Sequence, residues 1–260
     1  MSPHYQRALM LLQTNRVDDA ITELRTGLAT DPDDGYLLAL LAQSYLRKDD
    51  YTQAATLAEQ ALATDPNESY FHSVRAQTLL TTNRSAAALK AIKEALRIEP
   101  TTPSYYSLLS VIHHHRKEWQ EALEASEMGL ELDAENVNLL NHRSEALVKL
   151  NRRAEAVETA DFSLKNAPEN ADSHVNRAYA ALNIGDYDTA FDHYREALRL
   201  EPNNEYARHG LKEAIKAKNP AYRAVLNYFL WMDRLQAKYQ WGFIIGIYLL
   251  YRVVLWLAET

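Results

Sequence analysis

Three consecutive histidines, His113 to His115, are the most obvious candidates for chemistry in this chain. Adjacent residues of a helix point about 100° apart, so these side chains cannot converge on one metal ion. The 260 residues include no cysteine, and we find no nucleophile–base motif, phosphate-binding loop or metal-ligand spacing. We therefore expect no enzyme activity, no metal and no cofactor, and we interpret the histidines as a solvated or partly packed helix end.

A second set of polar residues recurs at intervals that are multiples of 34 positions. Arginine occupies one column and histidine another: Arg7, Arg75, Arg143 and Arg177; His4, His72 and His174. A role in binding is one interpretation of these residues, and a role in packing is the other. We favour packing, in which each arginine stem covers apolar surface while its head reaches an acid such as Asp65 or Asp133.

The elements that must position these residues follow the same period. Alanine recurs every 34 residues, and leucine and proline form parallel columns, with alanine replacing the fourth proline: Ala20, Ala54, Ala88, Ala122, Ala156, Ala190; Leu28, Leu62, Leu96, Leu130, Leu164, Leu198; Pro32, Pro66, Pro100, Ala134, Pro168, Pro202. A fixed period of this length indicates a stack of identical supersecondary units.

Each unit is predicted to be a pair of helices. In the sixth unit Gly185-Asp186 breaks the first helix, and the other units carry asparagine, aspartate or lysine there: Asn15, Asp49, Asn83, Lys117, Asn151. Glycine and asparagine tolerate the left-handed conformation that ends a helix, so this column marks a tight turn. Pro202 stops the second helix, because proline has no amide proton to donate.

The segment from Gly185 to Ala190, followed by Tyr194, Ala197-Leu198 and Glu201-Pro202, resembles the signature of the tetratricopeptide repeat. The resemblance covers residues 2–204 as six repeats, of which the fourth, Pro103 to Asn136, is the least regular. It implies an all-α fold, an α-α superhelix with a C-terminal capping helix over 205–219. We predict twelve repeat helices and no strand.

The resemblance also implies that the first helices line a concave groove. Projection of the repeat onto this chain assigns to that groove a mixture of polar and aromatic residues: Tyr36, Gln43, Arg47, Tyr70, Gln77, His115, Asn141, Glu145, Lys149, Asn176, Tyr179. Such a lining suits an extended peptide or a partner helix. The carboxylate clamp of the family's chaperone-tail adaptors is absent, and residues such as Tyr5, Leu9, His142, Asp172 and Asn176 occupy its positions. The net charge of −7 argues against nucleic acid as a partner.

The composition changes after Asn219-Pro220, and residues 220–260 form an appended apolar, aromatic segment. On a helical wheel its basic residues fall on one narrow stripe, and the run from Trp241 to Ala258 is apolar except for Arg252. A helix of that length spans about 27 Å, close to the hydrocarbon core of a bilayer. The residues expected at a membrane are Arg223, Trp231, Arg234, Lys238, Trp241 and Trp256.

Three interpretations of this tail stay open. Residues 221–258 are the first membrane segment of a longer protein, or a membrane anchor as they stand, or a helical hairpin that packs on the repeats or on a second copy. Arg252 opposes insertion, since arginine near a membrane centre costs about 2.5–3.5 kcal/mol.

We therefore predict a non-catalytic scaffold that binds a protein or peptide and is tethered to a membrane by its tail. The N-terminus shows no leader, and the basic residues before Trp241 favour a cytoplasmic location at the inner face of a membrane. The alternative is a soluble structural homo-oligomer whose C-terminal helices pack on the repeats or on a second copy.

Overall fold

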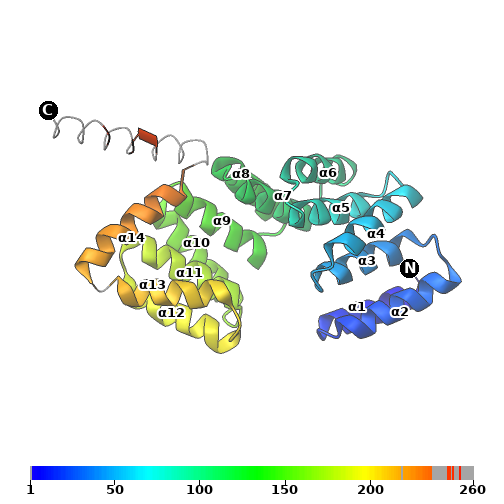
Figure 1. Ribbon diagram of the computed structural model, residues 1–260, viewed down its shortest axis with the longest axis horizontal. Helices are drawn as coiled ribbons and strands as arrows, with labels where there is room; N and C mark the ends of the chain where they lie inside the picture. The colour runs from blue at the N-terminus through cyan, green and yellow to red at the C-terminus, as the bar shows by residue number, and fades with distance from the viewer. Residues whose placement is uncertain (1, 218, 236–244, 247, 249–251, 253–260) are drawn as a thin grey trace. The chain divides into compact units, whose positions relative to one another are not determined.

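The computed structural model describes residues 2–217 and 219–235, together with 245, 246, 248 and 252 (Figure 1). Within these residues the regular elements are fourteen α-helices, without a strand. Twelve form the six predicted pairs: α1 Pro3–Gln13, α2 Val17–Thr30; α3 Gly35–Leu46, α4 Tyr51–Thr64; α5 Ser69–Thr81, α6 Ser85–Ile98; α7 Pro103–His115, α8 Trp119–Leu132; α9 Val137–Lys149, α10 Arg153–Asn166; α11 Ala171–Ile184, α12 Tyr187–Leu200. Two more follow, α13 Glu205–Lys216 and α14 Pro220–Asp233. The prediction of an all-α fold of consecutive helix pairs is confirmed.

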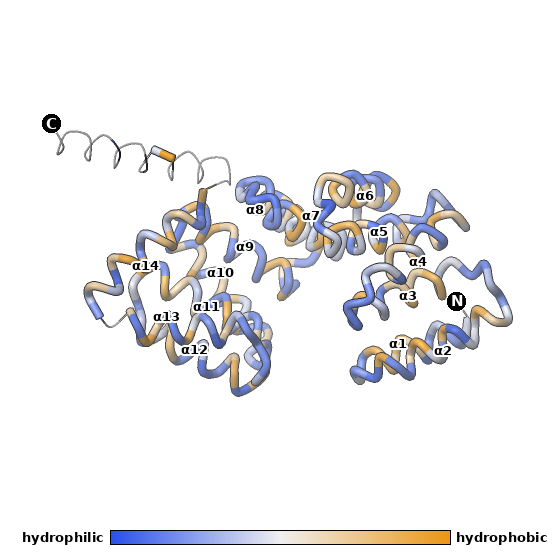
Figure 2. Tube along the Cα trace, in the orientation of Figure 1, coloured by the Kyte–Doolittle hydropathy of each residue, from blue (hydrophilic) through white to orange (hydrophobic). Residues whose placement is uncertain are grey.

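The chain divides into two compact units, residues 1–112 and 113–260. Each is described separately below as the N-terminal and the C-terminal unit. Apolar positions recur along the helices of both units (Figure 2), as amphipathic pairs require.

The turn inside each helix pair has the predicted left-handed backbone. Asn15, Asp49, Asn83, Lys117 and Asn151 have φ between 57° and 64°, and Gly185 has φ 86°. Lys117 adopts this conformation although it has neither a short polar side chain nor the conformational freedom of glycine. The left-handed backbone at this position is therefore set by the repeat geometry rather than by residue type alone.

The alanine column lies at the centre of the packing. All six alanines, from Ala20 to Ala190, are fully buried at 0% exposure. A methyl side chain at this point lets the two helices of a pair approach closely, and a larger residue would have to displace its neighbours.

The arginines of this column do pack as predicted, but they do not pair with the acids that we expected. Each arginine pairs with an acid in the middle of a second helix, sixteen residues away in sequence: Arg7–Glu23 at 2.6 Å, Arg75–Glu59 at 2.7 Å, Arg143–Glu127 at 3.3 Å, Arg177–Asp161 at 2.5 Å. The turn acids Asp65 and Asp133 cap their own turns, through bonds to Asn67 and Asn136. A side chain on one helix lies over the middle of the neighbouring helix and does not reach the turn at its end.

Helix α13 closes the last repeat through a close contact at Gly210. A Cβ atom at this position would overlap the ring of Tyr194, which is 3% exposed on α12. The absence of a side chain therefore lets α13 lie directly on the tyrosine.

Helix α14 continues the packed fold beyond Asn219-Pro220. Asn219 caps the helix by accepting from the Ala221 amide, and Pro220 is its first residue. Leu226, 5% exposed, joins the same apolar cluster as Tyr194 and Ala214. Residues 220–233 thus pack on the C-terminal unit, as the hairpin interpretation expected for the tail. No helix among the described residues is long and apolar enough to cross a bilayer; most of the run from Trp241 lies outside them.

Candidate peptide-binding site

The first helices of the repeats in the N-terminal unit pack side by side. Helices α1 and α3 contact each other, and α3 contacts α5. Between them lies an open pocket of about 350 Å³, which we call the N-terminal groove: Leu9, Leu12, Gln13, Leu40, Gln43, Leu46, Arg47, Gln77. Apolar and amide side chains alternate along its lining. Such a surface can bury an apolar side chain of a ligand and bond its backbone.

Polar side chains from adjacent repeats are joined along this groove. The side-chain amide of Gln43 donates to Oε1 of Gln77 at 3.1 Å, and the Tyr70 hydroxyl donates to Oε1 of Gln43 at 2.9 Å. Tyr36 stacks on Tyr70 with ring centroids 6.2 Å apart and an interplanar angle of 12°. Residues one repeat apart lie beside each other because the units stack in register, so this ladder is fixed before any ligand arrives.

The two tyrosines stay protonated. Tyr36 donates to Glu68, and this bond with the carboxylate is the main cause that raises the pKa of Tyr36 to about 12. Burial raises the pKa of Tyr70 further above its ordinary value. Both hydroxyls are therefore neutral at physiological pH.

Arg47 supplies the positive charge of the N-terminal groove. Its Nη1 donates to the Leu12 carbonyl at the end of α1, at 2.9 Å. The bond holds the guanidinium at the pocket, although Arg47 itself is exposed. A neutral carbonyl leaves the charge uncompensated, so the groove has a cation that suits a carboxylate.

The corresponding columns of the C-terminal unit are covered by the chain itself. Lys149 and Asn183 are the repeat equivalents of Gln13 and Arg47, and Tyr179 is the equivalent of Gln43. The Lys149 ammonium lies 5.4 Å from the ring centroid of Trp119 and 5.3 Å from that of Tyr179.

The end of α14 meets this cluster. Asp233 pairs with Lys149, and Trp119 donates its indole N–H to the Arg234 carbonyl at 2.8 Å. Burial lowers the pKa of Lys149, but its interactions with Tyr179 and with the Asp233 carboxylate outweigh this effect, and the net pKa is raised. The ammonium is therefore charged, and only 8% of its side chain is exposed.

The other predicted groove residues of this unit do not come together at one site. Asn141 is 4% exposed and bonded to Ser163 and Ser173, so its assignment to an open groove was wrong. It is an interior amide that satisfies two buried hydroxyls. Asn176 donates to the carbonyl of Asp172, one turn before it in its own helix. Glu145 lies 3.8 Å from His114, while His115 is exposed at the end of α7.

Two of the three neighbouring histidines make separate contacts. His113 bonds Glu118 at 2.7 Å, and His114 donates to the carbonyl of His142 at 3.1 Å. Their rings point to different elements, as expected for adjacent helical residues.

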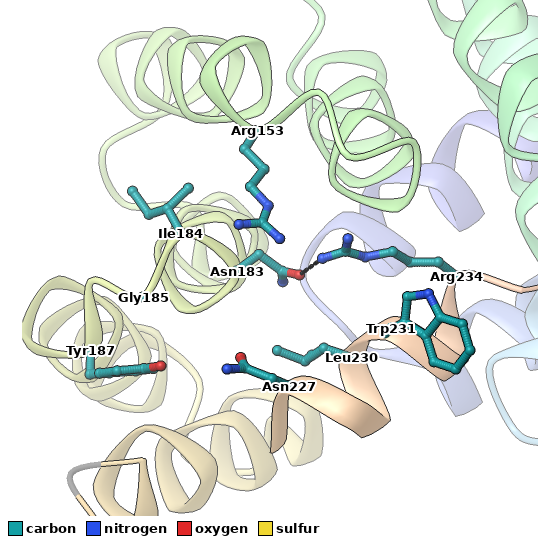
Figure 3. Close-up of a pocket in the computed structure, with 9 residues that line it drawn as sticks. All are labelled: Arg153, Asn183, Ile184, Gly185, Tyr187, Asn227, Leu230, Trp231 and Arg234. Carbon is teal, nitrogen blue, oxygen red and sulfur yellow. Dashed lines mark hydrogen bonds between the residues drawn. The ribbon is translucent and has the colours of Figure 1, made fainter. Parts of the chain in front are cut away.

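The basic stripe of the tail faces the repeats where the structure describes it, which corrects its expected orientation. Arg223 lies over the ring of Tyr187, 5.4 Å from its centroid, and donates to the Ala217 carbonyl. Arg234 donates to Asn151 at 2.8 Å and to Asn183 at 2.9 Å, and Figure 3 draws the second of these bonds. Trp231 lines a pocket together with Arg234 and is 41% exposed. Lys238, Trp241 and Trp256 lie outside the described residues.

Sequence reasoning missed Trp119, Asn183 and Asp233. Asn183 had a signal, since it occupies the column of Arg47 and Lys149. No feature of the sequence signalled Trp119 and Asp233, because their contacts with the repeat residues depend on how α14 packs against the repeats.

Comparison with known proteins agrees with this architecture. Sequence profiles described as tetratricopeptide repeat match residues 5–69, 45–112 and 143–205. They leave unmatched residues 113–142, which include most of the irregular fourth repeat. The chain belongs to the tetratricopeptide repeat family, whose members generally act as non-catalytic scaffolds for protein–protein interaction.

Curated relatives share part of the chain. A DnaJ homolog subfamily C member 3 homolog of Dictyostelium discoideum is 28% identical over 113 residues, 42% of this chain and 22% of the relative. Outer dynein arm-docking complex subunit 4 of Xenopus laevis is 28% identical over 104 residues, 40% of this chain and 20% of the relative. The matched stretch thus spans about a fifth of each relative.

Solved structures share the fold. The structure of the APC/C hetero-tetramer Cut9-Hcn1 superimposes with a TM-score of 0.72 and 17% identity, covering 81% of this chain and 42% of that one. The type IV pilus biogenesis factor PilW gives a TM-score of 0.68 and 15% identity, covering 80% and 96%. At these identities the likeness concerns the fold alone.

Proposed function

We propose that the chain is a non-catalytic scaffold that binds a segment of a partner protein in the N-terminal groove. The ligand is an extended peptide or a helix with an apolar side chain for the pocket between α1 and α3 and a carboxylate for Arg47. Tyr36 and Tyr70 offer a flat aromatic surface beside it, and the Gln43–Gln77 pair offers amide groups to the ligand backbone.

The observation that carries this proposal is the contrast between equivalent columns. In the C-terminal unit the equivalent residues hold the end of α14, since Lys149 pairs with Asp233 and Asn183 accepts from Arg234. In the N-terminal unit the same columns border an open pocket that contains a cation. The chain thus supplies an example of what these repeat positions can hold.

An array of short peptides, with and without acidic residues, tests the proposal on the full chain. We expect selection of peptides that combine an acid with an apolar side chain. Arg47→Ala should weaken capture about tenfold or more, since a charge-assisted hydrogen bond contributes about 1.5–3 kcal/mol. Gln77→Ala should weaken it less.

The control is Arg97→Ala, which removes another exposed arginine, on α6, that is paired with Glu94 outside the groove. Equal capture by the wild type, Arg47→Ala and Arg97→Ala would exclude the N-terminal groove as the binding surface.

The membrane tether predicted from residues 241–258 stays a prediction with support only from the apolar sequence. Flotation of the full chain with liposomes, compared with a chain that ends at Leu235, measures it. Equal flotation of the two chains would exclude the tether.

A further inference from the structure

A second pocket, of about 300 Å³, lies in the C-terminal unit between α14 and the turns of the last two repeats (Figure 3). Its lining includes two arginines, Arg153 at the start of α10 and Arg234 at the end of α14. None of the lining residues is an aspartate or a glutamate. The pocket does not overlap the N-terminal groove, so an inference about it is independent of the proposed function.

The two arginines converge on one neutral acceptor. Arg153 donates to the side-chain oxygen of Asn151 at 2.9 Å, and Arg234 donates to the same oxygen at 2.8 Å. Arg234 also donates to Asn183 at 2.9 Å. Two guanidinium groups that share an amide oxygen place two positive charges side by side without a carboxylate between them.

The nearby acids are engaged elsewhere. Asp233 pairs with Lys149 and lies 3.8 Å from Lys117, while Glu155 pairs with Arg152. Among the described residues, Arg153 has no ion pair. The Nε of Arg234 is buried and has no hydrogen-bond partner in the described part of the chain. Burial, and then the charge of Arg153, lower the pKa of the Arg234 guanidinium.

The rest of the pocket adds neutral donors. Figure 3 shows the Tyr187 hydroxyl and the Asn227 amide pointing toward each other at the other end of the pocket. Arg223 lies over the face of Tyr187 at the edge of this end.

From this arrangement we propose that the pocket is an anion site that binds the phosphate group of a small phosphate ester. Guanidinium groups match the geometry of phosphate oxygens, and Arg153 and Arg234 would bond two of them. Asn227 and Tyr187 would bond the remaining oxygens or the attached alcohol, for which the volume leaves space. A soluble phosphate ester and a lipid headgroup share this chemistry.

Titration calorimetry on the full chain, with glycerol 3-phosphate and with inorganic phosphate at constant ionic strength, tests the site. We expect saturable binding that Arg153→Gln weakens about tenfold or more, because it removes a charge-assisted bond. Arg153 is exposed, so the change leaves the fold intact. Tyr187→Phe should weaken binding of glycerol 3-phosphate more than that of inorganic phosphate.

Arg152→Gln is the matched control, since Arg152 is adjacent and exposed but bonded to Glu155 outside the pocket. Binding equal in the two arginine variants, or no saturable binding of either phosphate compound, would overturn the proposal. Vesicles of phosphatidylglycerol and of phosphatidylcholine identify the source of the phosphate. Weaker recruitment of Arg153→Gln to the anionic vesicles assigns the site to a lipid headgroup. Unchanged recruitment, together with weaker binding of glycerol 3-phosphate, assigns it to a soluble ester.

Discussion

Substitution of Leu226 by alanine should release α14 from the C-terminal unit while the repeats stay folded. Leu226 is the residue of α14 that is buried in the apolar cluster of α11 to α13, at 5% exposure. Its neighbours Tyr222 and Leu230 are only partly buried. The leucine should therefore contribute most of the apolar stabilisation of this helix.

The magnitude follows from the lost side chain. Leucine-to-alanine changes in cores cost about 2–5 kcal/mol, depending on how far the site can relax. Helix α14 follows the capping helix and can shift, so we expect the lower part of this range, about 2–3 kcal/mol. That lowers the ratio of docked to undocked helix by roughly 30- to 150-fold.

Hydrogen exchange measured by mass spectrometry is the assay, because it reports local opening with α1 to α6 as an internal reference. Amides of α14 should exchange faster in Leu226→Ala, and the Lys149–Asp233 pair should open with them. Phe229→Ala is the control, since Phe229 is on the same helix and 62% exposed. Unchanged exchange in Leu226→Ala, or equal acceleration in both variants, would refute the docking of α14 through Leu226.

Three further predictions concern the repeats and the helix α13 that follows them. Ala122→Leu should lower the thermal midpoint, because overpacking a helix crossing costs about 1–3 kcal/mol or more, and an unchanged melt would contradict the role of the alanine column. Gly210→Ala should also lower it, despite alanine's helix propensity, because the methyl group would overlap Tyr194; a rise in the midpoint would show that α13 can move away. Burial, and then the neighbouring His114, lower the pKa of His142 from 6.5 to about 4. The neutral imidazole therefore stabilises the fold fully above pH 6.5, and this contribution is lost as the pH falls toward 4. Urea unfolding should show that His142→Gln removes up to about 3 kcal/mol of this acid dependence, and parallel pH curves for the two proteins would exclude it.

The repeat architecture could be predicted because each of its constraints is local and recurs six times. The buried alanines and the left-handed turns depend on contacts inside one helix pair, so Ala20 and Asn15 report the same geometry as Ala190 and Gly185. Repetition at a constant interval distinguishes these positions from a chance pattern, even though Lys117 is not one of the preferred turn residues.

The side chains of the sites were less predictable. A column position fixes which helix carries a residue, but rotation of the helix by a fraction of a turn decides between core and groove. Asn141 was assigned to the groove and lies in the interior, bonded to Ser163 and Ser173. The acids that pair with the arginine column likewise depend on how neighbouring helices lie side by side, and the period alone does not specify this.

The sequence by itself determined the period, the helix pairs, the turns and the change of composition after Pro220. The tertiary structure decided where residues 220–235 pack, because the repeat pattern does not specify the position of a helix that lies outside the repeats. Its return brings Asp233 to Lys149 and Arg234 to Asn151, at separations of more than eighty residues that local patterns cannot encode. These long-range contacts cover the groove positions of the C-terminal unit with the end of α14, and they also form the arginine pocket.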